Sequence, residues 1–199
     1  MMTMKMVMVS YSMTGNNDAL AANIAAELGI ERVRITEPKV RTSARIALDM
    51  LFNRTPKVCP AVKTADGYDP ILFVGPVWMG HVAAPLRANL KHLRGGPSRY
   101  AFISISGGAD GPNPSLVRDL TKMTGRAPAA LIDLHIADLL PSDPKPTRQD
   151  TQGYHLRNQD VKGLTNIILK RLREAKVVED NGSERIHSPD ADNGRGSFC

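Results

Sequence analysis

Everything else in this chain can be arranged around one loop, Ser10-Tyr11-Ser12-Met13-Thr14-Gly15-Asn16-Asn17. Residues 6–9 before it are all apolar, and residues 19–28 after it are Ala-rich with apolar positions at helical spacing. The sequence therefore predicts a short buried strand, a polar loop and a helix in immediate succession.

A loop between a strand and a helix is well suited to holding a phosphate group. Backbone N–H groups at the start of a helix have no partner inside the helix, and the helix dipole adds partial positive charge there. Gly15 permits close approach of the backbone. The hydroxyls of Ser10, Ser12 and Thr14 can donate hydrogen bonds to phosphate oxygens. Because the loop contains no Lys or Arg, neutral donors would hold the anion.

A second interpretation of the same loop is purely structural, with Thr14 acting only as a cap for the helix that follows. The loop does not contain G-x-x-x-x-G-K-[ST], which excludes a nucleoside-triphosphatase loop, and it lacks the dinucleotide fingerprint G-x-G-x-x-G. Taken alone, the loop leaves phosphate binding and helix capping as equal alternatives.

Composition narrows the class of protein. The chain has 199 residues and 42% hydrophobic residues, which predicts one domain with a real core, residues 1–176, followed by a polar tail, residues 177–199, that we expect to be disordered. No apolar run is long enough to span a membrane, and no export signal is visible. The two cysteines, Cys59 and Cys199, lack metal-binding spacing. These observations favour the cytoplasm.

The charge of the chain is unevenly distributed. The net charge is +6, but residues 177–199 carry −3, so that the remainder carries +9. Such a body would attract acidic partners. Nucleic-acid binding is not expected, because aromatic residues make up only 5% of the chain and no basic cluster is interleaved with them.

Predicted strands and helices alternate along the whole chain. We expect further strands at 31–35, 71–74, 100–105 and 130–136, and further helices at 40–53, from about Pro85 to Gly95, at 114–124 and at 156–175. Residues 141–155 are predicted to form a loop. The alternation predicts an α/β fold, a three-layer doubly wound sheet of five parallel strands in the order 2-1-3-4-5. In that order the loops after strands one, three and four converge on one ligand site.

Three loops together resemble those of the flavodoxin family. Ser12-Met13-Thr14-Gly15-Asn16-Asn17 is similar to its phosphate loop, Gly75-Pro76-Val77-Trp78-Met79-Gly80 to its first flavin-ring loop, and Ser106-Gly107-Gly108 stands where its second ring loop lies. The resemblance covers about residues 5–175 and implies bound FMN and redox chemistry. It assigns cofactor binding to Ser10, Ser12, Met13, Thr14, Gly15, Asn16, Asn17, Pro76, Val77, Trp78, Met79, Gly80, Ser106, Gly107 and Gly108. It indicates no catalytic residue and no metal.

The residue types in the ring loops fit this assignment. Trp78 is the only tryptophan, and an indole face stacks well on a flat tricyclic ring. Its alternative role is to pack half-buried against the following helix. The glycines of both loops allow backbone amides to approach a ring edge, or serve only as ordinary tight turns. His81 would border the ring, although a surface histidine is the preferred interpretation.

Three departures from the family pattern bear on function. Asn17 stands where Thr is usual and would offer an amide donor in place of a hydroxyl. Residues 106–111 contain no aromatic side chain, and the body is basic rather than acidic. The last two features favour an FMN-dependent oxidoreductase that passes electrons from a reduced donor to a quinone-like or similar acceptor. The alternatives are an electron-transfer flavoprotein that docks to redox partner proteins, and a cofactor-free interaction module. The donor, the acceptor and the oligomeric state stay open.

Overall fold

The computed structural model describes residues 5–38, 49, 54–60, 65–108, 111 and 113–179. Its centre is a parallel sheet of five strands in the order β2-β1-β3-β6-β7, which confirms the predicted order 2-1-3-4-5. The strands are β1 (Val7–Ser10), β2 (Glu31–Arg34), β3 (Ile71–Val74), β6 (Tyr100–Ser106) and β7 (Ala130–His135). The chain therefore adopts the doubly wound α/β fold that the alternation of elements predicts.

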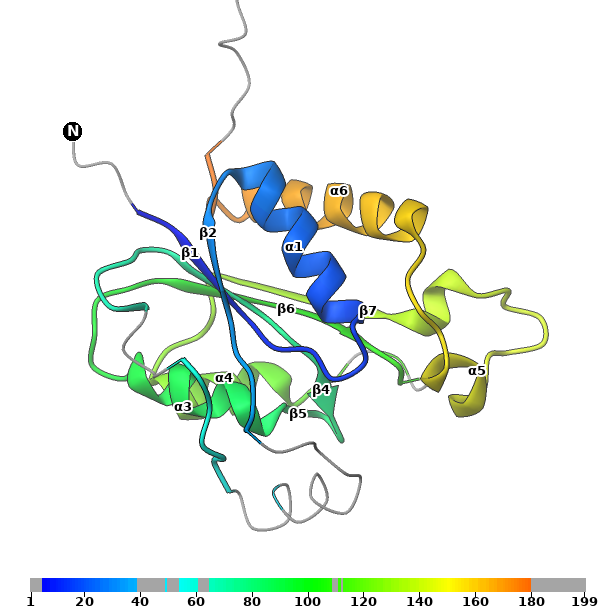
Figure 1. Cartoon of the computed structure of the whole chain (residues 1–199), viewed down its shortest axis with the longest axis horizontal. Coiled ribbons are helices and arrows are strands. Elements are labelled where there is room, and N and C mark those ends of the chain that lie inside the picture. Colours follow the sequence, from blue (N-terminus) through cyan, green and yellow to red (C-terminus); the bar gives the residue numbers. More distant parts are fainter. Residues whose placement is uncertain are drawn as a thin grey trace, which may run out of the picture.

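Helices cover both faces of the sheet (Figure 1). One face carries α1 (Asn16–Leu28) and α6 (Asn158–Glu174), and the other carries α3 (Ala84–His92) and α4 (Leu116–Thr124). After β7 come the short 3-10 helix η2 (Ile136–Leu139) and the short helix α5 (Arg148–Gln152). The predicted helix at 40–53 falls almost wholly outside the described residues.

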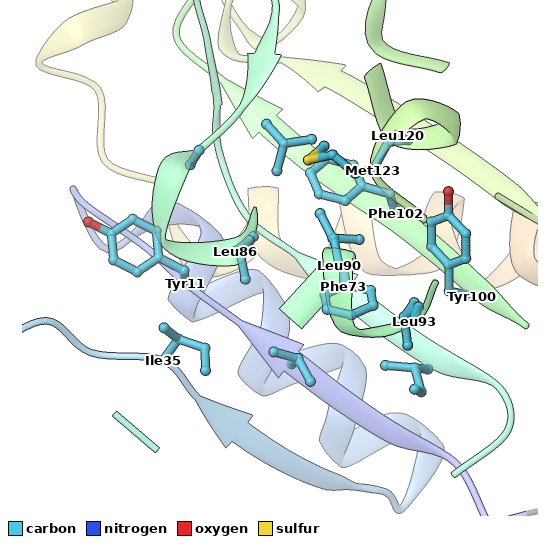
Figure 2. Close-up of a cluster of buried hydrophobic side chains, with 14 of the residues drawn as sticks. Tyr11, Ile35, Phe73, Leu86, Leu90, Leu93, Tyr100, Phe102, Leu120 and Met123 are labelled. Carbon is cyan, nitrogen blue, oxygen red and sulfur yellow. The ribbon is translucent and has the colours of Figure 1, made fainter. Parts of the chain in front are cut away.

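The core forms two layers because side chains alternate along each strand. Phe73 of β3 and Phe102 of β6 point to the α3–α4 face, where they pack with Leu86, Leu90 and Leu120 (Figure 2). The intervening strand residues point to the opposite face and pack against α1 and α6. Both faces of the central strands are thus apolar, as expected of a parallel sheet with helices on both sides.

Two boundaries differ from the predicted ones, the start of the first helix and the end of the packed part of the chain. Helix α1 begins at Asn16, three residues before the Ala-rich segment, because Gly15 adopts a left-handed conformation with φ 97° and turns the chain into the helix. At the other end of the chain, Val177 and Val178 are buried against the α1–α6 side of the core. Packing therefore continues beyond the boundary predicted at residue 176.

A short hairpin that the sequence pattern did not predict follows β3. Strands β4 (Val77–Trp78) and β5 (His81–Val82) pair antiparallel around the two-residue turn Met79-Gly80. Both turn residues have positive φ, 51° and 78°, as hairpin turns of this length favour. The hairpin makes up most of the first of the two loops that the flavodoxin resemblance singled out for ring binding.

Gly75, directly after β3, provides a test of packing at this junction. A Cβ atom there would overlap the buried Cδ1 of Leu86 and would lie 3.3 Å from the backbone oxygen of Tyr11. We expect Gly75→Ala to lower the free energy of unfolding by about 1–3 kcal/mol, because the core must shift to admit the methyl group. Thermal or denaturant unfolding measures the change.

Gly163 provides the matched control, because it is an exposed residue of α6 and a Cβ atom there would meet nothing within 4 Å. Gly163→Ala is expected to raise stability by up to about 1 kcal/mol, since alanine favours the helical conformation. Equal stability changes of the same sign for the two variants would contradict the packing argument.

Candidate functional site

A cavity of about 660 Å³ lies at the carboxyl ends of the strands. It is walled by the loops that follow β1, β3 and β6, on either side of the point where the strand order reverses. Ligands of doubly wound sheets bind at this position, and the volume is within the roughly 300–1,000 Å³ of small-molecule pockets. The described lining residues are Met13, Thr14, Asn16, Asn17, Pro76, Val77, Trp78, Met79, Gly80, Ile105, Ser106, Gly107, Gly108, Gly111, Asn113, His135, Ile136, Arg148, Thr151 and Gln152.

The N-terminus of α1 opens into this cavity without a side-chain cap. Gly15 occupies the N-cap position, and its N–H donates to Ser12 Oγ at 3.0 Å. The interpretation of Thr14 as a helix cap is therefore wrong. The first hydrogen bond of the helix runs from the Ala19 N–H to the Gly15 oxygen, so the N–H groups of residues 16–18 have no partner inside the helix. Together with the Thr14 hydroxyl, they form a potential anion site.

Three of the fifteen predicted site residues do not line the cavity. Ser10 is completely buried in β1, and its hydroxyl has no hydrogen-bond partner among the described residues. Ser12 and Gly15 bond to each other and shape the turn into α1. The structure brings the other twelve predicted residues together around the cavity.

The side chain of Asn17 has a structural task rather than the predicted one. Its Nδ2 donates to the Ile105 oxygen at 2.8 Å, and its Oδ1 accepts the Ile105 N–H at 3.1 Å. Asn17 is only 2% exposed, so this pair fixes the first turn of α1 to the end of β6. The amide donor expected at position 17 is thus engaged inside the protein, and the backbone N–H of the same residue faces the helix N-terminus instead.

Trp78 is held at the cavity wall by Tyr11. The two ring centroids are 6.0 Å apart and the ring planes are nearly perpendicular, at 84°, which is a favourable edge-to-face contact. Trp78 is half-buried against the core and also lines the cavity, so it combines features of both interpretations of this residue. Met79 at the tip of the hairpin is 74% exposed and lies on the cavity rim.

His81 lies on the other strand of the hairpin and does not line this cavity. Its Nδ1 lies 3.6 Å from Asp119 Oδ2 on α4, and its side chain is half exposed. This placement agrees with the preferred interpretation of a surface histidine.

The third wall of the cavity has a polar cluster behind it that was not predicted. His135 Nδ1 lies 3.4 Å from Ser106 Oγ, and His135 Nε2 lies 3.5 Å from Asp133 Oδ2. That carboxylate oxygen accepts hydrogen bonds from the Asn113 backbone N–H and from Asn113 Nδ2. Within the described residues, Ser104 Oγ, Asp133 Oδ1 and His135 Nε2 are buried without a hydrogen-bond partner. Since His135 also lines the cavity, this wall can offer polar contacts to a ligand.

A signal for this cluster is present in the sequence. Ser104 and Ser106 alternate with apolar residues in β6, and Asp133 and His135 do the same in β7. Strand pairing sets Ser104 beside Asp133 and Ser106 beside His135. Side chains two residues apart share a face of the sheet, so the four polar groups gather on one side.

Residues 140–156, which we call the strap, close the cavity on its outer side. The Thr151 hydroxyl donates to the Gly107 oxygen, and Thr151 is 1% exposed. Asn16 binds the strap with its carboxamide, donating to the Tyr154 oxygen at 2.8 Å and accepting the Leu156 N–H at 3.0 Å. The strap thus connects the first and third loops of the site, and its helix α5 projects beyond the carboxyl ends of the strands (Figure 1).

The far end of the strap is fixed at the start of α6. Tyr154 donates its hydroxyl hydrogen to Asp160 Oδ2 at 2.8 Å, and Arg157 contacts both oxygens of the same carboxylate. The hydrogen bonds from Arg157 hold the pKa of Asp160 at about 2, well below its ordinary value. The Asp160 carboxylate, which holds Tyr154 and Arg157, therefore stays charged throughout the neutral pH range.

The described part of the chain offers neither a metal centre nor a membrane span. No group of three or more His, Cys, Asp or Glu side chains in it could hold a metal ion. None of its helices is long and apolar enough to cross a bilayer.

The strand order and the position of the cavity define a flavodoxin-like α/β protein. Solved structures share this fold. The flavoprotein of Lactobacillus acidophilus NCFM in complex with FMN matches with a TM-score of 0.55 and 20% identity over 66% of this chain and 93% of its own. The apo-form of the flavoprotein from the same organism matches with a TM-score of 0.52 and 20% identity over 68% of this chain and 93% of its own. A protein of Bacteroides uniformis ATCC 8492 matches with a TM-score of 0.57 and 15% identity over 74% of this chain and 95% of its own. No family model and no curated protein matches the sequence.

The bidentate contact of Asn17 gives a testable prediction. Asn17→Ala leaves the N–H and the oxygen of Ile105 unsatisfied in a buried place, and we expect it to lower the free energy of unfolding by about 2–4 kcal/mol. Met13→Ala, in the same loop but 47% exposed, serves as the control and is expected to change stability by less than about 0.5 kcal/mol. Denaturant unfolding of both variants measures the difference, and similar small effects would show that the contact is dispensable.

Proposed function

We propose that the chain binds FMN in this cavity and is an FMN-dependent oxidoreductase, passing electrons from a reduced donor to a quinone-like or similar acceptor. The observation that carries the proposal is the combination of an uncapped helix N-terminus with a tryptophan and two glycine-containing loops in one cavity. A ligand with a terminal phosphate and a flat ring fits this combination. The flavoprotein of the same fold from Lactobacillus acidophilus forms a complex with FMN.

The residues present fit the two ends of FMN. The N–H groups at the start of α1 and the Thr14 hydroxyl would hold the phosphate. Trp78 and the hairpin would form one wall for the ring, and the backbone of residues 106–108 the opposite wall. His135 also lines the cavity, and an imidazole can donate to or accept from a ligand with polar atoms.

When bound, FMN supplies the redox chemistry, and the chain supplies binding and access. The wall formed by residues 106–108 is made of a serine and two glycines, and no aromatic side chain belongs to the described residues of the 106–111 loop. This wall therefore provides no aromatic ring to cover the second face of the flavin, and the strap residues that line the cavity, Arg148, Thr151 and Gln152, provide none either. This composition supports an enzyme with a small-molecule acceptor over a carrier whose ring is covered on both faces.

The second candidate function is electron transfer to a partner protein. It is supported by two exposed apolar side chains on the rim of the cavity, Met13 and Met79. Contiguous apolar surface beside a binding site is typical of docking surfaces, and these two side chains would contribute to such a surface. Turnover of a quinone with NADH or NADPH in the absence of any other protein would favour the enzyme, and reduction that requires a partner protein would favour the carrier.

The identity of the flavin is the first test. We expect the purified protein to be yellow, and heat treatment to release FMN that chromatography separates from FAD and riboflavin. FMN is expected because α1 provides one phosphate site and the sequence has no second fingerprint for an adenylate half. Release of FAD would refute the assignment, and a colourless protein that binds no added flavin would favour the cofactor-free module.

Thr14 provides a test of the phosphate end. Thr14→Val removes one hydroxyl donor to a charged group, which is worth roughly 1.5–3 kcal/mol, and should weaken FMN binding about ten-fold or more. The affinity can be read from the emission of Trp78, the only tryptophan, which a nearby flavin would quench. Thr121→Val, on the exposed side of α4, is the control and should bind FMN as the wild type does. Equal affinities of the two variants would place the phosphate elsewhere.

A further inference from the structure

The cavity contains one permanently charged side chain. Of the described residues that line it, Arg148 alone carries a permanent charge, and no Asp or Glu is among them. The loop at 10–17 has no Lys or Arg, so this charge reaches the cavity from a distant part of the sequence. Within the described residues, the structure gives the Arg148 guanidinium no carboxylate partner. An unpaired cation in a cavity without acids fits an anionic ligand.

The strap determines where Arg148 lies. Residues three apart on a helix share a side, so Arg148 and Thr151 both face the cavity from α5. Thr151 is fixed to Gly107, and the carboxamide of Asn16 holds the strap at Tyr154 and Leu156. Because Asn16 is also the first residue of α1, these contacts set the strap beside the N-terminus of that helix. The cation and the uncapped N–H groups therefore belong to one cavity whose walls are hydrogen-bonded to each other.

We propose that Arg148 pairs with the phosphate of FMN and so makes the site select phosphorylated flavin over riboflavin. This inference rests on the proposed function. The N–H groups of α1 and the Thr14 hydroxyl are neutral donors, so only the partial charge of the helix dipole would oppose the charge of a phosphate. A guanidinium matches the geometry of phosphate oxygens and forms strong charge-assisted hydrogen bonds with them. The strap thus supplies the cation that the phosphate loop lacks.

The test compares two ligands that differ only in the phosphate. FMN and riboflavin are titrated into apoprotein and followed by Trp78 emission, for the wild type and for Arg148→Gln. We expect Arg148→Gln to weaken FMN binding about ten-fold while riboflavin binding stays within two-fold of the wild type. Added inorganic phosphate should compete with FMN less effectively in Arg148→Gln than in the wild type. Arg148→Lys, which keeps the charge but not the planar fork, should fall between the two.

Lys145→Gln is the matched control for charge. Lys145 belongs to the same strap but does not line the cavity, so its removal changes the net charge equally without removing the contact. Its affinity for both flavins should stay within two-fold of the wild type. The side chain of Arg148 is exposed and only its backbone oxygen is bonded within α5, so Arg148→Gln should fold normally, as an unchanged melting temperature would verify.

Four outcomes would overturn the inference in different ways. Equal weakening of FMN and riboflavin would place Arg148 against the ring rather than the phosphate. Unchanged binding of both would make it a surface cation without a role in cofactor binding. A wild-type protein that binds neither flavin would refute the proposed cofactor itself, whereas wild-type binding of both flavins with equal affinity would refute only the role of a phosphate-binding cation.

Discussion

The site depends on one buried contact, the pair of hydrogen bonds between the Asn17 carboxamide and the backbone of Ile105. Hydrogen bonds between the parallel strands fix the positions of the strand ends, but the loops beyond the strands have no such bonds between them. Asn17, in the first turn of α1, adds one further pair of hydrogen bonds, because its carboxamide bonds to the N–H and the oxygen of Ile105 near the end of β6. Buried backbone groups are costly when unpaired, so the first and third walls of the cavity keep a fixed separation.

Because these side chains support the structure, the groups that remain to bind a ligand are mainly backbone groups. Asn16 and Asn17 both point their carboxamides into the protein, toward the strap and toward β6. The groups left at the N-terminus of α1 are main-chain N–H donors, whose direction is set by the helix and which need no reordering when an anion binds. The residue types of the loop suggest that amide side chains are the donors. The structure instead leaves backbone N–H donors, whose directions the helix sets, and one hydroxyl, that of Thr14.

The fold and the three loops could be predicted because their signals are local. Apolar runs, helical spacing and glycines near strand ends are all read within about ten residues. The strap could not be placed in this way, since Asn16 meets Tyr154 and Leu156 from 138 and 140 positions away. The cluster around His135 needed the register of β6 against β7. The hairpin had only part of a turn signal, because Gly80 suits a turn position with positive φ whereas Met79 is not a residue type that such turns favour.

The net charge of the body is a poor guide to partners, because part of it has a structural task. Arg94, just after α3, donates to the oxygens of Lys122 and Met123 at the end of α4. Arg126, just after α4, donates in return to the oxygens of Leu93 and Gly96 beyond the end of α3. Cations at helix C-termini satisfy orphan carbonyls and the negative end of the dipole, so each helix of this pair is capped from the other. A basic composition that would suggest an acidic partner therefore serves partly to hold α3 against α4, and the charge that bears on ligand choice is the local one within the cavity.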